Sequence, residues 1–392
     1  MSLHASPTCF SGTTSTPEVA IVGAGVIGLG IGWCLAKSGC SVAIFERGEA
    51  GRGASWAAAG MLAAGLEAEP GEKALLALNL ESQRRWPAFR QQVEAAAGFD
   101  IGYRNEGSLR IALNRDDVEK LRFDYEFQIE CGINLQWLNG IEARQLEAHL
   151  CPGVQAATFS PNDHQVDSRR LTAALKAAFQ GQGGQLHETT AVSAVDVVDG
   201  TCRGVVVGDD VHGADIVVWA TGPWAHDPDV LPPAALPPVR PIKGQMLSLQ
   251  MNPKMPLLNH VLRAPKAYLV PRHDGRLIIG ATVEEAGFDD RLTAGGLLTL
   301  LEGAWQALPS VEDMPIDESW VGFRPGSRDD APILGPSTVD GLLLANGHHR
   351  HGILLTPLTS EAISQLILTG HPPDCIKEFS PQRFRKMKEA MS

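Results

Sequence analysis

Residues 18–47 read EVAIVGAGVIGLGIGWCLAKSGCSVAIFER, with apolar segments on both sides of a glycine-rich turn. The apolar run at 19–22 is typical of a buried parallel strand. Residues 29–37 continue as a helix, which Ser38 and Gly39 end. Residues 41–45 form a second apolar strand. The stretch therefore predicts a βαβ unit.

Three glycines stand directly after the first strand in the pattern GxGxxG. Gly23 permits a tight turn, Gly25 lets the backbone approach a pyrophosphate, and Gly28 lets the helix pack close to the strand. The unpaired N–H groups of the helix N-terminus then face the anion. Glu46 closes the second strand 18 residues after Gly28, where its carboxylate can accept hydrogen bonds from a ribose. This context favours a dinucleotide site over a merely glycine-rich turn, although the motif does not separate FAD from NAD.

The next segment, GRGASWAAAGM at 51–61, is a run of small residues with one arginine and one serine. One interpretation is a loop and helix start that pack tightly against their neighbours. The other is a backbone surface against which a large flat cofactor lies, with its diphosphate near Arg52 and Ser55. The motif R-x-x-S-x-A-A-A-G-M-L resembles the segment that contacts the flavin in the glycine oxidase and D-amino acid oxidase group of FAD-dependent amine oxidases.

This resemblance extends from about residue 18 to about residue 370 and is strongest to the bacterial glycine oxidases of thiamine biosynthesis. It implies an α/β fold, in which a Rossmann-like FAD-binding domain carries an inserted antiparallel, β-rich substrate domain. The discontinuous FAD-binding domain is expected at 18–95, 150–235 and 325–392. The substrate-binding domain is expected at 96–149 and 236–324. The implied cofactor is FAD, bound without a covalent link.

Three later segments have patterns of their own. Residues 164–176 predict an amphipathic helix capped by Asp167 or Ser168, followed by a strand around 191–192. Residues 214–225, ADIVVWATGPWA, predict a buried strand whose carboxyl end places Gly222 at the cofactor cleft. From 237 to 280 the pattern is β-rich, with a hairpin turn at 273–275.

Two arginines and a tyrosine are expected at the substrate. Arg324 and Arg350 lie among apolar and glycine residues, where an isolated charge is costly. A planar guanidinium suits bidentate binding of a carboxylate. The resemblance implies that Arg324 holds the amino acid's carboxylate, that Arg350 lies near the flavin and helps to anchor the substrate, and that the Tyr268 phenol points at the carboxylate. For Tyr268 the alternative is an aromatic side chain packed on a sheet.

The remaining cofactor contacts follow from the motifs and the resemblance together. Val192 is expected on the adenine side, and the loop at 348–354 is expected to place backbone N–H groups against the flavin. No catalytic acid or base is expected, and no metal, since three close histidines lack a carboxylate partner in the sequence. The predicted cofactor-binding residues are Gly23, Gly25, Val26, Ile27, Gly28, Glu46, Arg47, Arg52, Ala54, Ser55, Ala59, Gly60, Met61, Val192, Gly222, His348, His349, Arg350, His351, Gly352, Ile353 and Leu354.

The composition of the 392 residues excludes other classes of protein. The 45 acidic residues outnumber the 33 lysines and arginines, so the basic field that a nucleic acid requires is absent. The 18-residue charge-free run at 19–36 contains five glycines and is explained better by a strand, a turn and a helix than by a membrane span. The seven cysteines are scattered, which indicates reduced thiols and a cytoplasmic protein. Residues 1–17 predict a disordered tail without a signal peptide.

The resemblance implies oxidation of glycine or another small amino acid, such as sarcosine or a D-amino acid, by molecular oxygen. The expected products are a 2-oxo acid, ammonia and hydrogen peroxide, formed through an imine that can feed thiazole synthesis. A homo-oligomer and a thiazole synthase partner are implied as well. Lys266 and Val283 depart from the family pattern and are expected to line the substrate chamber. The alternatives are a related enzyme with another electron acceptor, a nicotinamide-dependent dehydrogenase and a non-catalytic flavin-binding protein.

Overall fold

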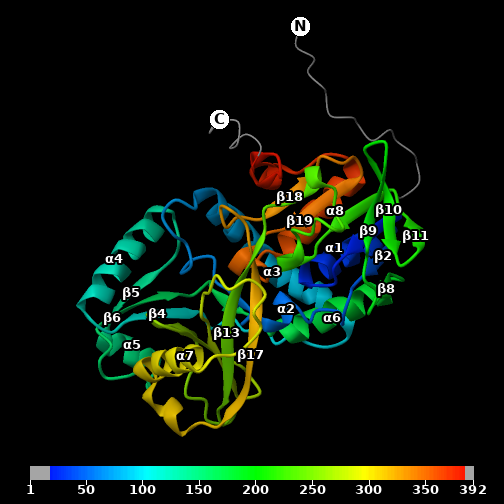
Figure 1. The fold of residues 1–392 in the computed structure, drawn as a ribbon. Coiled ribbons are helices and arrows are strands. Elements are labelled where there is room, and N and C mark those ends of the chain that lie inside the picture. Colours follow the sequence, from blue (N-terminus) through cyan, green and yellow to red (C-terminus); the bar gives the residue numbers. More distant parts are fainter. Residues whose placement is uncertain (1–17, 385–392) are drawn as a thin grey trace.

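A computed structural model describes residues 18–384, and the tail predicted for residues 1–17 lies outside them. A six-stranded sheet in the order β18-β19-β12-β1-β2-β8 forms the centre of one lobe (Figure 1). Its neighbouring strands are parallel except for the antiparallel pair β18–β19. In chain order, the strands are β1 Glu18–Val22, β2 Ser41–Phe45, β8 Gln185–His187, β12 Ile216–Trp219, β18 Ile333–Pro336 and β19 Leu342–Asn346.

Both faces of this sheet are buried, because alternate residues of β1 belong to different cores. Val19 and Ile21 pack with the helices, whereas Ala20 and Val22 pack with a three-stranded antiparallel sheet. The small sheet consists of β9 Ala194–Val198, β10 Thr201–Val207 and β11 Asp210–Gly213. The helices are α1 Val26–Lys37, α3 Lys73–Ala97, α6 Ser168–Gly181 and α8 Thr356–Thr369. The resulting layers of helices, parallel sheet and small sheet confirm the predicted Rossmann-like domain.

The predicted strand around residues 191–192 is wrong, since residues 189–193 lie between β8 and β9. The backbone N–H groups of Thr189 and Thr190 donate to the carbonyls of Gly48 and Glu46. Residues 189–193 therefore pass across the carboxyl end of β2 and do not extend the sheet. The helix predicted to follow Asp167 is confirmed, and the Asp167 carboxylate caps it by accepting hydrogen bonds from two backbone N–H groups.

An eight-stranded sheet forms the second lobe, in the order β17-β13-β16-β15-β14-β4-β6-β5. It is antiparallel, as predicted, except that β14 and β4 run parallel. The hairpin turn at 273–275 joins β15 to β16 as expected. The strands are β4 Ser108–Ala112, β5 Gln136–Asn139, β6 Ala156–Ser160, β13 Arg240–Gln250, β14 Val261–Arg263, β15 Tyr268–Pro271, β16 Arg276–Gly280 and β17 Ile316–Gly326.

The residues of β6 were expected in the FAD-binding domain, which we predicted to resume at residue 150. That boundary is too early, because β6 pairs with β4 and β5 and so completes the eight-stranded sheet. The remaining domain boundaries stay a prediction.

Helices cover both faces of the eight-stranded sheet. Helix α7 (Ala294–Ala307) packs in the core formed by one face, and helix α4 (Arg115–Glu130) packs against the other face. The long strands β13 and β17 run side by side between the two lobes (Figure 1). The remaining elements are α2 Ala54–Ala57, β3 Met61–Leu62, α4 Arg115–Glu130, α5 Gly140–Leu146, β7 His164–Gln165, α7 Ala294–Ala307 and the 3₁₀ helices η1 Gly222–Trp224, η2 Pro233–Ala235, η3 Pro309–Asp313, η4 His349–His351 and η5 Asp374–Phe379.

Within residues 18–384, no helix combines the length and the apolarity needed to cross a bilayer. The six cysteines in this range carry free thiols, in agreement with the predicted reduced state.

A buried arginine joins the hairpin of the eight-stranded sheet to the other lobe. Arg272 is 7% exposed, and its guanidinium donates to the carbonyls of Ala59 and Val166 and to the side-chain oxygen of Gln165. Burial lowers the pKa of Arg272 to about 10, and the charge of Asp167 opposes this shift. The side chain therefore stays charged at neutral pH and satisfies acceptors that water does not reach.

We expect Arg272→Met to lower the free energy of unfolding by about 3 kcal/mol or more, because it leaves several buried acceptors unpaired. The measurement is urea denaturation followed by intrinsic fluorescence. Arg84→Met is the matched control, since Arg84 is 71% exposed and pairs only with Glu81 on the helix surface. It should change stability by no more than about 0.5 kcal/mol. Equal effects of the two substitutions would contradict the structural role of Arg272.

Candidate active site

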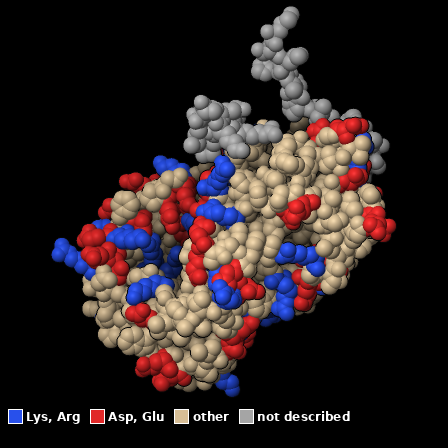
Figure 2. All heavy atoms as spheres, in the orientation of Figure 1, with Lys and Arg blue, Asp and Glu red and all other residues tan. Residues whose placement is uncertain are grey.

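A cavity of about 1040 Å³ extends from the carboxyl ends of β1 and β12 to the face of the eight-stranded sheet. Its volume is at the upper end of the range of about 300–1,000 Å³ for small-molecule and cofactor sites. Every predicted substrate- and cofactor-binding residue lines it, with the exception of Gly28. Lys266 and Val283 line it too, as expected. Acidic and basic side chains are interspersed over the face of the molecule in Figure 2.

The glycine motif meets the cavity at the N-terminus of α1. Gly25 is the N-cap residue, and a Cβ atom at this position would lie 3.2 Å from the Ser55 hydroxyl. This hydroxyl accepts a hydrogen bond of 3.0 Å from the backbone N–H of Val26. Gly28 does not line the cavity but packs against the glycine turn, where a Cβ atom would collide with the Gly23 carbonyl oxygen. Gly28 thus contributes to the close packing of the turn and the helix, as the motif predicts.

The Glu46 carboxylate is fixed at the end of β2. One oxygen accepts from the backbone N–H of Ala24 at 2.9 Å, and the other accepts from that of Gly48 at 3.1 Å. Each carboxylate oxygen has a further lone pair, so Glu46 can still accept hydrogen bonds from a ribose.

The backbone of the small-residue run is held from outside. Its four consecutive carbonyls each accept a hydrogen bond from a different part of the chain, at 2.6 to 3.0 Å. These pairs are Ala57 with the Trp320 indole, Ala58 with the Ser168 hydroxyl, Ala59 with the Arg272 guanidinium and Gly60 with the backbone N–H of Val166. The run therefore presents a rigid surface of backbone and methyl groups to the cavity.

These features fit FAD. The helix N-terminus offers N–H groups to a diphosphate, Glu46 can bind a ribose, and the run at 57–60 can support a flat ring system. At Gly222, where φ is +59°, no atom lies within 4 Å of the place that a Cβ atom would take, so the backbone leaves open space. Val192 lines the same cavity from an irregular segment.

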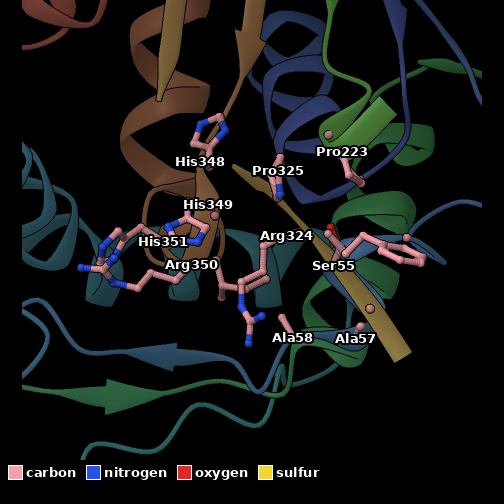
Figure 3. Close-up of a pocket in the computed structure, with 18 of the residues that line it drawn as sticks. Ser55, Ala57, Ala58, Pro223, Arg324, Pro325, His348, His349, Arg350 and His351 are labelled. Carbon is pink, nitrogen blue, oxygen red and sulfur yellow. The ribbon is translucent and has the colours of Figure 1, made fainter. Parts of the chain in front are cut away.

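At the other end of the cavity, Arg324 extends between the turn at 348–351 and the segment with Ala57 and Ala58 (Figure 3). Its guanidinium donates to the Thr282 carbonyl at 3.1 Å and packs over Gly244, where a Cβ atom would lie 2.7 Å from the guanidinium. No carboxylate within residues 18–384 lies at ion-pair distance from Arg324. Its charge is therefore available to a ligand.

Tyr268 lies beside Arg324, on β15. Burial raises the pKa of the Tyr268 phenol above its usual value, and the charge of Arg324 opposes this shift. The phenol packs over Gly280, and its hydroxyl is 3.9 Å from the Met246 sulfur. The hydroxyl is therefore protonated at neutral pH and lies within hydrogen-bonding reach of the Arg324 guanidinium.

Arg350 differs from its expected environment. The sequence suggested a charge isolated among apolar residues, but Arg350 donates to Glu72 at 2.9 Å and lies 3.8 Å from Glu67 and from Glu69. These carboxylates come from a loop and a helix start some 280 residues earlier in the sequence, which no local pattern reveals. Arg350 lines the cavity, yet its charge is already compensated.

The three histidines of the loop are neutral at physiological pH. Burial lowers the pKa of His348 and of His351 to about 3 and that of His349 to about 4. His348 is within 3.1 Å of the Thr359 hydroxyl, and His351 is 3.5 Å from the Asn79 amide. No group of three or more metal-ligating side chains occurs in the described part of the chain.

Several residues of the cavity, among them Trp224 and Phe323, were not predicted from the sequence. The Trp224 ring contacts Phe323, and the guanidinium of the predicted residue Arg47 stacks on it at 4.0 Å. Trp224 belongs to the segment at 214–225, but nothing in its local pattern indicates a ligand. Glu67 and Arg263 form an ion pair and line the cavity together with Arg324. They are distant in sequence, and only the fold brings them together.

Known proteins resemble this chain over most of its length. The family described as DAO, FAD dependent oxidoreductase, matches residues 18–366. The glycine oxidase of Geobacillus kaustophilus is 37% identical over 359 residues, which cover 89% of this chain and 92% of that protein. The crystal structure of glycine oxidase from Geobacillus kaustophilus superposes with a TM-score of 0.87 and 35% identity, covering 94% of this chain and 99% of that one.

A longer relative is the bifunctional protein ThiO/ThiG of Synechocystis sp., which is 38% identical over 376 residues. The match covers 94% of this chain and 54% of that protein, so the chain spans about half the length of this relative.

Because the buried histidines have lower pKa values in the folded protein than the ordinary 6.5, the unfolded chain binds more protons between pH 6.5 and about 3. The free energy of unfolding should therefore fall as the pH drops through this window. His348→Asn should make the fall less steep by about 1 kcal/mol per pH unit between pH 6 and 4.

The measurement is urea denaturation at a series of pH values. The exposed His371 supplies the control His371→Asn, which should leave the slope unchanged. A slope that does not respond to His348→Asn would show that His348 does not titrate differently in the two states.

Proposed function

Since the chain belongs to the family of FAD-dependent oxidoreductases, we propose that it oxidises glycine, or another small amino acid, with molecular oxygen. The products are a 2-oxo acid, ammonia and hydrogen peroxide, with an imine that water hydrolyses. The similarity to glycine oxidases over about nine tenths of the chain supports glycine as the substrate. Sarcosine and small D-amino acids are the related candidates.

The environment of Arg324 carries this proposal. An arginine without a carboxylate partner, inside a cavity and beside a phenol, is suited to bind a carboxylate through two parallel hydrogen bonds. A small substrate held in this way presents its α-carbon to the ring system supported by residues 57–60. We therefore assign the carboxylate to Arg324, with Tyr268 as a second donor.

The protein contributes binding and orientation to the reaction. The bound flavin supplies the chemistry of a hydride acceptor. Arg324 and Tyr268 fix the carboxylate end, so that the substrate has few orientations in the cavity. The neutral histidines at 348, 349 and 351 add no positive charge to repel an amine. No acid or base of the protein is required if the amine binds in its neutral form.

A link to thiazole synthesis is supported by the ThiO/ThiG relative, of which this chain spans about half. We propose that the imine feeds thiazole synthesis and that a thiazole synthase is a partner. A homo-oligomer and a cytoplasmic location remain part of the same proposal.

An absorbance spectrum of the purified protein under anaerobic conditions tests the function. We expect flavin bands that bleach on addition of glycine and return on admission of air. If the bands bleach only with sarcosine or a D-amino acid, that compound and not glycine is the substrate. If the bands bleach but do not return in air, the electron acceptor is not oxygen.

Arg324→Ala should raise the KM for glycine about 10- to 100-fold, because a charge-assisted pair is lost, while FAD stays bound. The measurement is peroxide formation at varied glycine concentration, with the flavin content determined in parallel. Arg324→Lys is the matched variant, which keeps the charge but loses the planar geometry. Its KM for glycine should lie between that of the wild type and that of Arg324→Ala. An unchanged KM in Arg324→Ala would remove Arg324 from the carboxylate site.

A further inference from the structure

Glu67 is a charged side chain in the cavity to which the proposed reaction gives no role. It lies in the loop after β3 and is only 9% exposed. The loop is fixed, because the buried Asp163 carboxylate accepts hydrogen bonds from the backbone N–H groups of Gly65 and Leu66 at 3.0 and 2.8 Å. The position of Glu67 is therefore set by the fold and not by a flexible segment.

Three basic side chains surround the Glu67 carboxylate. Arg263 donates a hydrogen bond to one oxygen, and the other oxygen lies 3.8 Å from Arg350 and 3.9 Å from the His351 ring nitrogen. Burial acts to raise the pKa of Glu67, but the charges of Arg263 and Arg350 and the hydrogen bond from Arg263 hold it below its ordinary value. Glu67 is thus an anion at neutral pH, and its charge is matched to the guanidinium groups around it.

This group lies next to the carboxylate site. Arg263 is paired with Tyr268 across the strands β14 and β15, and Tyr268 lies beside Arg324. Of the four guanidinium groups at this end of the cavity, Arg110 is paired with Asp124, Arg263 with Glu67, and Arg350 with Glu72 and Glu67. Arg324 donates to the Thr282 carbonyl and lies within hydrogen-bonding reach of the Tyr268 hydroxyl, and within residues 18–384 it has no carboxylate at ion-pair distance.

We propose that Glu67 determines the charge specificity of the substrate site. By occupying Arg263 and Arg350, it leaves Arg324 for a single carboxylate, and it repels a second one. The site then selects amines with one carboxylate over amines with two. This inference rests on the proposed role of Arg324 in binding the substrate.

Two lysines also line the cavity and could attract a second carboxylate. Lys120 is exposed on α4, where water screens its charge, and Lys266 pairs with Glu302 at 3.4 Å on the surface. Arg110 is paired with Asp124 at 2.7 Å. None of them compensates the buried anion at Glu67.

Succinate and succinamate test the proposal with the FAD-loaded protein. They have the same shape and differ in one charge, and neither carries an amine, so neither is oxidised. The perturbation of the flavin absorption spectrum gives the dissociation constant of each. We expect wild-type protein to bind succinamate at least about tenfold more tightly than succinate. Equal affinities would overturn the proposal without any variant.

Glu67→Gln should bring the ratio of the two dissociation constants to within about threefold of one, or invert it. Glu72→Gln is the matched control, because Glu72 holds Arg350 as well but does not line the cavity. Its ratio should stay within about threefold of the wild-type value. A ratio that Glu67→Gln leaves unchanged, or that Glu72→Gln changes equally, would overturn the role of Glu67.

Glu67→Gln leaves Arg263 without its partner and can impair folding, which the flavin content reports. The double variant Arg263→Gln/Glu67→Gln then replaces it, since it removes one negative and one positive charge together. Its ratio should lie between the wild-type value and one, because the repulsion by Glu67 is lost but no guanidinium is freed at position 263. The anaerobic glycine experiment separates the two proposals. Bleaching by glycine together with equal binding of succinate and succinamate overturns only the role of Glu67. Absence of bleaching overturns glycine as the substrate, while the succinate ratio still tests Glu67.

Discussion

The hydrogen bonds to the four carbonyls of residues 57–60 join the parts of the molecule that form the cavity. A backbone segment of such small residues has few side-chain atoms with which to hold its shape, so its partners must hold it. The donors come from β17, from α6, from Val166 and from the hairpin of the eight-stranded sheet. The segment therefore fixes both lobes relative to each other and forms one wall of the cavity. The same four hydrogen bonds thus hold the segment in place and shape the surface that it presents to the cavity.

Charge compensation organises the other end of the cavity. Burial of an ion is costly, and Arg263 and Arg350 are both supplied with carboxylates by the loop and helix start at residues 67–72. Arg324 stands apart from these pairs, with a neutral phenol beside it. The two ends of the cavity therefore differ in chemistry. The glycine motif lies at one end, and Arg324, the guanidinium group without a carboxylate partner in the described residues, lies at the other.

The parts of the fold that depend on local pattern could be predicted from the sequence. The βαβ unit, the Asp167 cap and the hairpin at 273–275 follow from spacing and turn chemistry within a few residues. Placement of Tyr268 and Arg324 in one cavity required the family resemblance. The ion pairs of Glu67 and Arg350 and the crossing at 189–193 could not be predicted, because their partners lie at distant points of the sequence. Two interpretations failed for this reason: the isolation of Arg350 and the strand at Val192.

The cavity is assembled from segments that lie more than 300 residues apart in the sequence. Its wall starts with Val22 and Gly23 and is completed by residues 348–354, and β1 is flanked by β12 only after the long intervening segments have been made. During synthesis on the ribosome, the glycine motif emerges early but remains half a binding site. The nascent chain gains a closed cofactor pocket only when residues 348–354 have been translated, so cofactor capture must wait until the segments between the two halves of the site are made.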